Sequence, residues 1–139
     1  MTFNFSSSTQ IRVRYGETDQ MGYCYYGNYA QYFEVGRVEA LREVGLSYKE
    51  MEAKGIMLPV SEYTVKYISP AFYDDKLIIT TKISSLKGCR LFFEYEIYNA
   101  ENKKIAFAST TLVFVLKSTM KPVTPPEDFL KLMNNYEIK

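Results

Sequence analysis

Apolar and polar residues alternate along this chain with two different periods, which predict helices in some segments and strands in others. Small and apolar residues first recur at helical spacing, at Tyr29, Tyr32, Phe33, Gly36, Ala40 and Val44. This stripe predicts a long helix with a charged outer face, begun by the N-cap residue Asn28 and ended by Gly45. Because a glycine inside a helix costs about 1 kcal/mol relative to alanine, Gly36 indicates that the helix backbone lies close against a sheet.

Alternation with a period of two predicts strands. The first strand has Ile11, Val13 and Tyr15 on one face, and the second has Tyr63 and Val65 on one face. The predicted strands cover residues 9–15, 62–67, 76–86, 90–98 and 104–117. The last three are joined by short links, so they must form an antiparallel meander.

Capping signals predict two short helices. Ser47 and Glu50 form a capping box for a helix that runs to about residue 54. A terminal helix over about residues 125–135 is indicated by Thr124, Pro125 and Glu127. One antiparallel sheet against one long helix is an α+β arrangement, and its free edges and uncovered face predict a homo-oligomer.

Composition sets the class of protein. A chain of 139 residues with 47% hydrophobic and 24% charged residues fits one globular domain, residues 1–139. The net charge is +1 and the basic residues are scattered along the chain, which argues against a nucleic-acid partner. No membrane span or signal peptide is apparent, so we expect a cytoplasmic protein with reduced cysteines at positions 24 and 89.

The chain contains no histidine. This excludes nucleophilic pairs of serine or cysteine with histidine, and it argues against a zinc site. We therefore expect no metal and no bound cofactor. Acid–base chemistry near neutral pH must fall to aspartate, glutamate, lysine, tyrosine or cysteine.

The segment from Arg14 to Arg37 carries a family resemblance. Three glycines interrupt the loop over residues 16–27. The matching features are Thr18-Asp19, Gly22, the aromatic pair Tyr25-Tyr26, and Asn28-Tyr29 at the helix start. This segment resembles the hotdog-fold thioesterases of the 4-hydroxybenzoyl-CoA type and their Tol-Pal-associated relatives. The resemblance covers about residues 9–118 and implies a five-stranded antiparallel sheet wrapped around one long helix.

The resemblance implies hydrolysis of an acyl-CoA or acyl carrier protein thioester by a dimer or a dimer of dimers. Asp19 would be the catalytic carboxylate, either as general base or as nucleophile. A helix start exposes free amides, which suit an oxyanion. The resemblance and this geometry together make Gly22, Tyr26, Gly27 and Asn28 the expected oxyanion and substrate-binding residues, with the amide of Tyr26 or Gly27 as donor.

Other readings of these residues remain open. Asp19 in a glycine-rich loop also suits an Asx-turn. Glu34 on the helix is a rival carboxylate, although a surface position near Arg37 explains it as well. Many relatives in the Tol-Pal branch carry a histidine where this chain has Tyr26, so only a mechanism that uses the backbone at this position can operate here. The alternative function is non-catalytic binding of acyl-CoA. A hotdog hydratase or dehydratase ranks below it, because such enzymes resemble one another in using a histidine and this chain has none.

Overall fold

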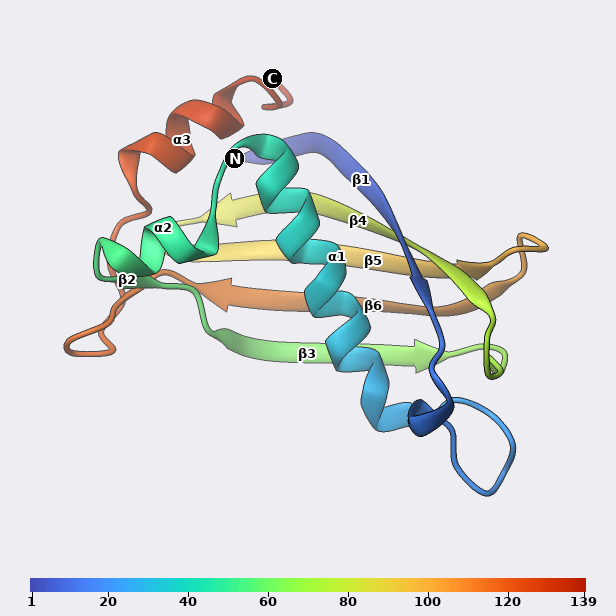
Figure 1. The fold of residues 1–139 in the computed structure, drawn as a ribbon. Coiled ribbons are helices and arrows are strands. Elements are labelled where there is room, and N and C mark those ends of the chain that lie inside the picture. Colours follow the sequence, from blue (N-terminus) through green and yellow to red (C-terminus); the bar gives the residue numbers. More distant parts are fainter.

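The computed structural model describes all 139 residues as one long helix lying across an antiparallel sheet (Figure 1). The strands are β1 (Thr2–Arg12), β2 (Ile56–Met57), β3 (Val60–Tyr67), β4 (Lys76–Lys87), β5 (Arg90–Asn99), β6 (Lys104–Val113) and β7 (Val115–Leu116). The helices are α1 (Tyr29–Val44), α2 (Tyr48–Ala53) and α3 (Glu127–Asn134), with 3-10 turns η1 (Tyr15–Glu17) and η2 (Tyr26–Asn28).

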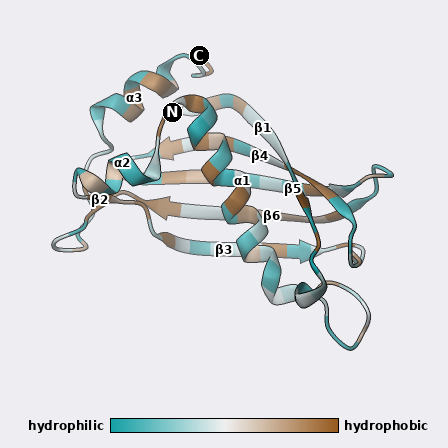
Figure 2. Cartoon of the chain, viewed as in Figure 1, coloured by the Kyte–Doolittle hydropathy of each residue, from teal (hydrophilic) through white to brown (hydrophobic).

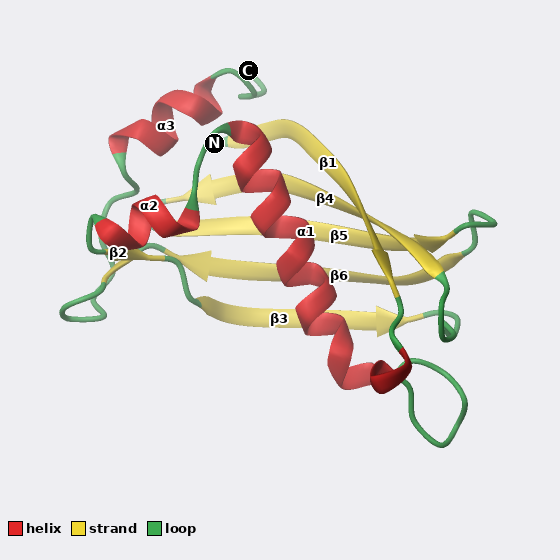
Figure 3. Ribbon diagram, in the orientation of Figure 1, coloured by secondary structure: helices red, strands yellow, loops and turns green.

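The main sheet has five strands in the order β1-β4-β5-β6-β3, with antiparallel pairing between neighbours. The predicted meander is confirmed as β4, β5 and β6, while β1 and β3 form the two edges. The strand predicted over residues 104–117 ends at Val113, and its last residues form β7, which pairs with β2 in a small second sheet. This second sheet was not predicted, because two-residue strands leave no periodic signal. Helices α2 and α3 lie at the end of the sheet away from the start of α1 (Figure 3).

Helix α1 has the bounds and the buried face that its spacing predicts. All six residues of the predicted stripe are buried, and Gly45 ends the helix with a left-handed φ of 113°. Figure 2 shows the alternating hydrophilic and hydrophobic bands of this two-faced helix. Gly36 lies against β4: a Cβ there would be 2.5 Å from Thr81 Oγ1 and 2.9 Å from Ile79 Cγ2. The predicted close approach of helix and sheet is therefore confirmed.

The first strand differs from its prediction. It begins at Thr2, and the alternation that decides its faces is carried by Phe3, Phe5 and Ser7, which are buried. The serines in this stretch weakened the apolar signal. The strand ends at Arg12, so Tyr15 lies in η1 and is 76% exposed instead of sharing a strand face with Val13.

The two short helices were predicted with different success. Ser47 caps α2 as expected by accepting a hydrogen bond from the Glu50 amide. Helix α3 begins at Glu127 after Pro126, and no side chain caps it. The predicted cap at Thr124 is wrong, because two prolines in succession hold the chain extended for two further residues.

One contiguous hydrophobic core runs from Phe3 in β1 to Met133 in α3. The chain between residues 136 and 138 lies along the start of β1, with Asn4 N donating to Tyr136 O and Ile138 N donating to Thr2 O. This segment covers part of the β1 edge, whereas β3 is exposed along most of its length. None of the helices combines the length and apolar character that a membrane crossing requires.

The contact at Gly36 predicts how a substitution there changes the stability of the protein. Gly36→Ala gains about 1 kcal/mol of helix propensity but places a methyl group inside the van der Waals distance of Thr81 and Ile79. We expect net destabilisation by about 1–2 kcal/mol, measured by urea unfolding. Val35→Ala at the neighbouring exposed position is the control, with an expected change within about 0.5 kcal/mol. A Gly36→Ala protein as stable as the wild type would contradict the close contact.

Candidate active site

The loop between β1 and α1 folds back on itself before the helix begins. The backbones of Cys24 and Thr18 pair in an isolated antiparallel β-bridge, and Tyr25 N donates to Glu17 O at 2.8 Å. Gly22 turns the loop at its tip with a left-handed φ of 88°, which favours glycine. The loop and the start of α1 therefore form one unit at the end of the sheet where β1 leaves it (Figure 3).

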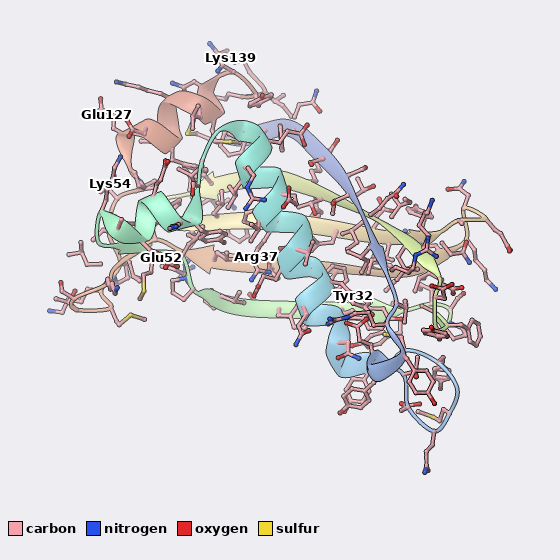
Figure 4. The ribbon with its side chains drawn as sticks, viewed as in Figure 1. Tyr32, Arg37, Glu52, Lys54, Glu127 and Lys139 are labelled. Carbon is pink, nitrogen blue, oxygen red and sulfur yellow. The ribbon has the colours of Figure 1, made fainter.

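Glu17 ties this unit together. Its carboxylate accepts hydrogen bonds from the Arg14 amide at 2.8 Å and from the Tyr32 hydroxyl at 2.9 Å, and it pairs with the Arg14 guanidinium at 3.2 Å. Its carbonyl oxygen accepts from Asn28 Nδ2 at 2.7 Å. The side chain is only 11% exposed. One buried residue thus joins the end of β1 to the first turns of α1, where Figure 4 shows Tyr32.

The ionisation of these groups follows from their surroundings. Burial raises the pKa of Glu17, but the hydrogen bonds from Arg14 and Tyr32 and the charge of Arg14 outweigh it, so its pKa lies below the ordinary value. Burial raises the pKa of Cys24, whose Sγ lies 3.3 Å from the Tyr32 hydroxyl. Burial and the Cys24 contact likewise raise the pKa of Tyr32. The carboxylate is therefore charged, and the thiol and the phenol are neutral at pH 7.

A pocket of about 380 Å³ opens beside this network. Its walls come from the loop, the start of α1 and the end of β3, through Asp19, Met21, Tyr23, Cys24, Tyr26, Tyr29, Tyr67, Ile68, Ser69 and Pro70. Asp19 is the only carboxylate among them. The fold therefore brings Asp19 and Tyr26, two of the predicted site residues, to the walls of one apolar pocket.

Asp19 takes part in a turn and still has a free oxygen. Its Oδ1 accepts from the Met21 amide at 2.9 Å, which is the Asx-turn that a loop aspartate commonly forms. Oδ2 has no hydrogen-bond partner in the chain. The side chain is partly buried. The turn thus fixes the carboxylate while leaving one oxygen available to a ligand.

The helix start supplies free donors. The amides of Tyr26 and Gly27 donate to no acceptor in the chain, whereas the Asn28 amide donates to Tyr25 O at 3.0 Å. Asn28 is the N-cap residue by position but caps no amide with its side chain, which binds Glu17 instead. A Cβ on Gly27 would lie 2.5 Å from the Tyr25 ring, so the ring packs directly on the backbone there.

The rival carboxylate Glu34 and the adjacent pair Asp74 and Asp75 lie elsewhere. Glu34 is 66% exposed and lies 4.0 Å from Arg37, the expected i,i+3 pair. Asp74 and Asp75 shape the turn before β4, where Asp74 has a φ of 70° and Asp75 accepts from the Phe72 amide. Neither aspartate lines the pocket of Asp19.

Sequence reasoning missed Glu17, because a single glutamate in an aperiodic loop has no signal that predicts burial. It also missed the contribution of β3 to the pocket. Tyr29 and Tyr67 pack edge to face with ring centroids 5.1 Å apart, and this contact forms only when the sheet closes under α1. Of the tyrosines between β1 and α1, Tyr23 and Tyr26 line the pocket, while Tyr15 and Tyr25 do not.

The chain is similar to known thioesterases. Residues 13–133 match the Thioesterase-like superfamily. The acyl-CoA thioester hydrolase YbgC of Escherichia coli strain CFT073 is 36% identical over 120 residues, which cover 86% of this chain and 90% of that protein. The DHNA-CoA thioesterase structure from Staphylococcus aureus superposes with a TM-score of 0.90 at 34% identity, over 94% of this chain and 89% of that one. A 4-hydroxybenzoyl-CoA thioesterase structure has a TM-score of 0.85 at 19% identity, over 94% and 99% of the two chains, a likeness of fold alone.

The Glu17 network predicts that the free energy of unfolding decreases at acid pH. Since the pKa of Glu17 is lowered in the folded chain, its contribution is complete above the unfolded value of about 4.3 and is lost as the pH falls through the folded value. We expect Glu17→Gln to lower the free energy of unfolding at pH 7 by about 1–3 kcal/mol and to flatten the pH dependence below about 4.3. Urea unfolding at several pH values measures both.

The matched control is Glu101→Gln, which changes a carboxylate in the exposed β5–β6 turn. This variant should unfold like the wild type at every pH. If the free energy of unfolding falls equally with pH for Glu17→Gln and the wild type, the Glu17 charge contributes no stability.

Proposed function

This chain belongs to the thioesterase-like superfamily, and we propose that it hydrolyses acyl-CoA thioesters to a free acid and coenzyme A. Its five-stranded antiparallel sheet and long α1 form the hotdog fold of that family. The observation that carries the catalytic proposal is the pocket whose only carboxylate, Asp19, shares its walls with Tyr26 at the helix start.

In this proposal the thioester carbonyl lies between Asp19 Oδ2 and the free amides of Tyr26 and Gly27. The positive end of the α1 macrodipole adds to the field of these amides. As the carbonyl carbon becomes tetrahedral, its oxygen gains negative charge that the amides stabilise by about 2.7–4 kcal/mol per donor. Both free amides are backbone groups, so the tyrosine side chain at position 26 does not hinder this role.

The chemistry follows one of two routes. Asp19 Oδ2 removes a proton from a water molecule whose oxygen attacks the carbonyl carbon, or it attacks that carbon itself and forms a mixed anhydride that water then opens. In both routes the carbon–sulfur bond breaks, and the coenzyme A sulfur leaves as a thiolate that takes up a proton. Cys24 is no rival nucleophile, because burial keeps its thiol protonated.

We assign the working form to a homodimer built on β3. This edge strand is unpaired on its outer side and carries Val60, Tyr63 and Tyr67, which are 44%, 37% and 43% exposed. The β1 edge is partly covered by residues 136–138. Pairing two β3 strands would satisfy their free backbone groups and cover this apolar surface. We also assign the protein to the cytoplasm, in keeping with its two free cysteines.

Asp19→Asn separates catalysis from loop structure. Asparagine keeps the oxygen that accepts from the Met21 amide but cannot act as base or nucleophile. We expect kcat to fall by about 100- to 10,000-fold in a thiol-release assay over short, long and aromatic acyl-CoAs. Asp128→Asn in α3 is the control and should keep full activity. Full activity of Asp19→Asn would show that Asp19 serves only to form the turn. Ligand binding without thiol release by the wild type would favour a non-catalytic binding protein.

The dimer proposal predicts the effect of a charge on each edge. Thr64 in β3 and Ser8 in β1 are exposed edge residues whose hydroxyls each bind a neighbouring strand, at 2.7 and 3.1 Å. In sedimentation at micromolar concentration we expect the wild type at twice 16.2 kDa. Thr64→Asp should weaken the dimer, because like charges approach across the paired strands. Ser8→Asp should have no effect, and a wild-type monomer would exclude the dimer.

A further inference from the structure

Arg37 is a buried cation without full pairing. The residue is 9% exposed and lies in the part of α1 that crosses the sheet (Figure 4). Two buried side-chain polar atoms in the chain have no hydrogen-bond partner, Arg37 Nε and Thr81 Oγ1. The nearest carboxylate to Arg37 is Glu34, at 4.0 Å and largely in solvent. Because a buried donor without an acceptor is costly, the unpaired Nε is a group that a ligand could satisfy.

Arg37 lines a cavity of about 240 Å³ between α1, β3 and β6, together with Phe33, Glu34, Val60, Tyr63 and Thr110. Arg37 is the only cation in this wall, and Glu34 is the only anion. Burial lowers the pKa of Arg37, but the neighbouring hydroxyls of Tyr95 and Tyr48 more than compensate. Arg37 therefore remains charged, and its planar group suits a carboxylate bound through two hydrogen bonds.

This cavity and the Asp19 pocket both open where α1 faces β3, along a line that we call the α1–β3 seam. Tyr29 and Tyr67 line the Asp19 pocket, while Phe33 and Tyr63 line the Arg37 cavity. The two tyrosines of β3 are each partly exposed in the single subunit, so aromatic surface lies between the two openings. In the proposed β3-paired dimer this surface faces the partner subunit. Eight residues of helix separate Tyr29 from Arg37, which is about 12 Å along the axis.

We propose that this seam binds acyl chains that carry a carboxylate at their far end, with the thioester at Asp19 and the distal carboxylate on Arg37. The inference rests on the proposed thioesterase function and specifies its substrate class. The spacing favours a medium or long dicarboxylic chain over a short one. Glu34 opposes this binding by its charge, and its exposure allows it to turn away into solvent.

The test compares paired substrates of equal length: succinyl- with butyryl-CoA, suberoyl- with octanoyl-CoA, and dodecanedioyl- with dodecanoyl-CoA. For the wild type we expect kcat/KM to favour the dicarboxylic member by about tenfold or more at one of the two longer lengths. Arg37→Met should abolish this preference, Arg37→Lys should keep part of it, and Glu34→Gln should increase it. Isothermal titration with free suberate and dodecanedioate, against octanoate and dodecanoate, measures the same preference without turnover.

The outcomes separate this inference from the proposed function. Turnover of neutral acyl-CoAs without preference for any dicarboxylic chain overturns the subsite and leaves the thioesterase. Dicarboxylate binding that Arg37→Met removes, without turnover of any thioester, supports the subsite and overturns the thioesterase. If Arg37→Met disrupts self-association and leaves the preference unchanged, the carboxylate partner belongs to a second copy and the inference is wrong. Should both Arg37 variants fail to fold, an unchanged preference in Glu34→Gln overturns it.

Discussion

With no side chain on Gly36, the backbone of α1 lies so close to β4 that a Cβ would be 2.5 Å from Thr81 Oγ1. This contact sets the height of the helix above the sheet. It allows Tyr29 and Phe33 to pack against tyrosines of β3, and it brings the start of the helix beside the point where β1 ends. Both openings of the α1–β3 seam depend on this spacing, because a helix held further away would separate the aromatic pairs that line them.

Glu17 provides the second constraint, and it acts on the loop. A buried carboxylate is stable only when hydrogen bonds and a countercharge replace its water, and here Arg14 and Tyr32 do so. The same residue binds Tyr25 and Asn28 through its carbonyl. Glu17 thus fixes the loop that carries Asp19 at the end of β1 and at the start of α1. The proposed mechanism needs such a fixed position for the Asp19 carboxylate and the two amides.

Most of the fold could be predicted from the sequence, because each long element has a strong period. The stripe from Tyr29 to Val44 predicted α1, and alternation predicted β3 to β6. Where the pattern was weak, the prediction failed: serines masked the first half of β1, and successive prolines displaced the start of α3. Asp19 and Tyr26 were predicted as site residues from a motif, and both line one pocket. Glu17 and the burial of Arg37 depend on tertiary contacts that one sequence does not display.

The segment at residues 136–138 has a consequence for assembly. By lying on the start of β1, it covers part of one border of the sheet, whereas the β3 border is open along its length. A subunit with a single open border closes into a pair and stops, whereas a subunit with two can add copies at both ends without limit. Loss of these few residues would therefore lengthen the open part of the β1 border and favour the addition of copies at both edges over the proposed closed pair.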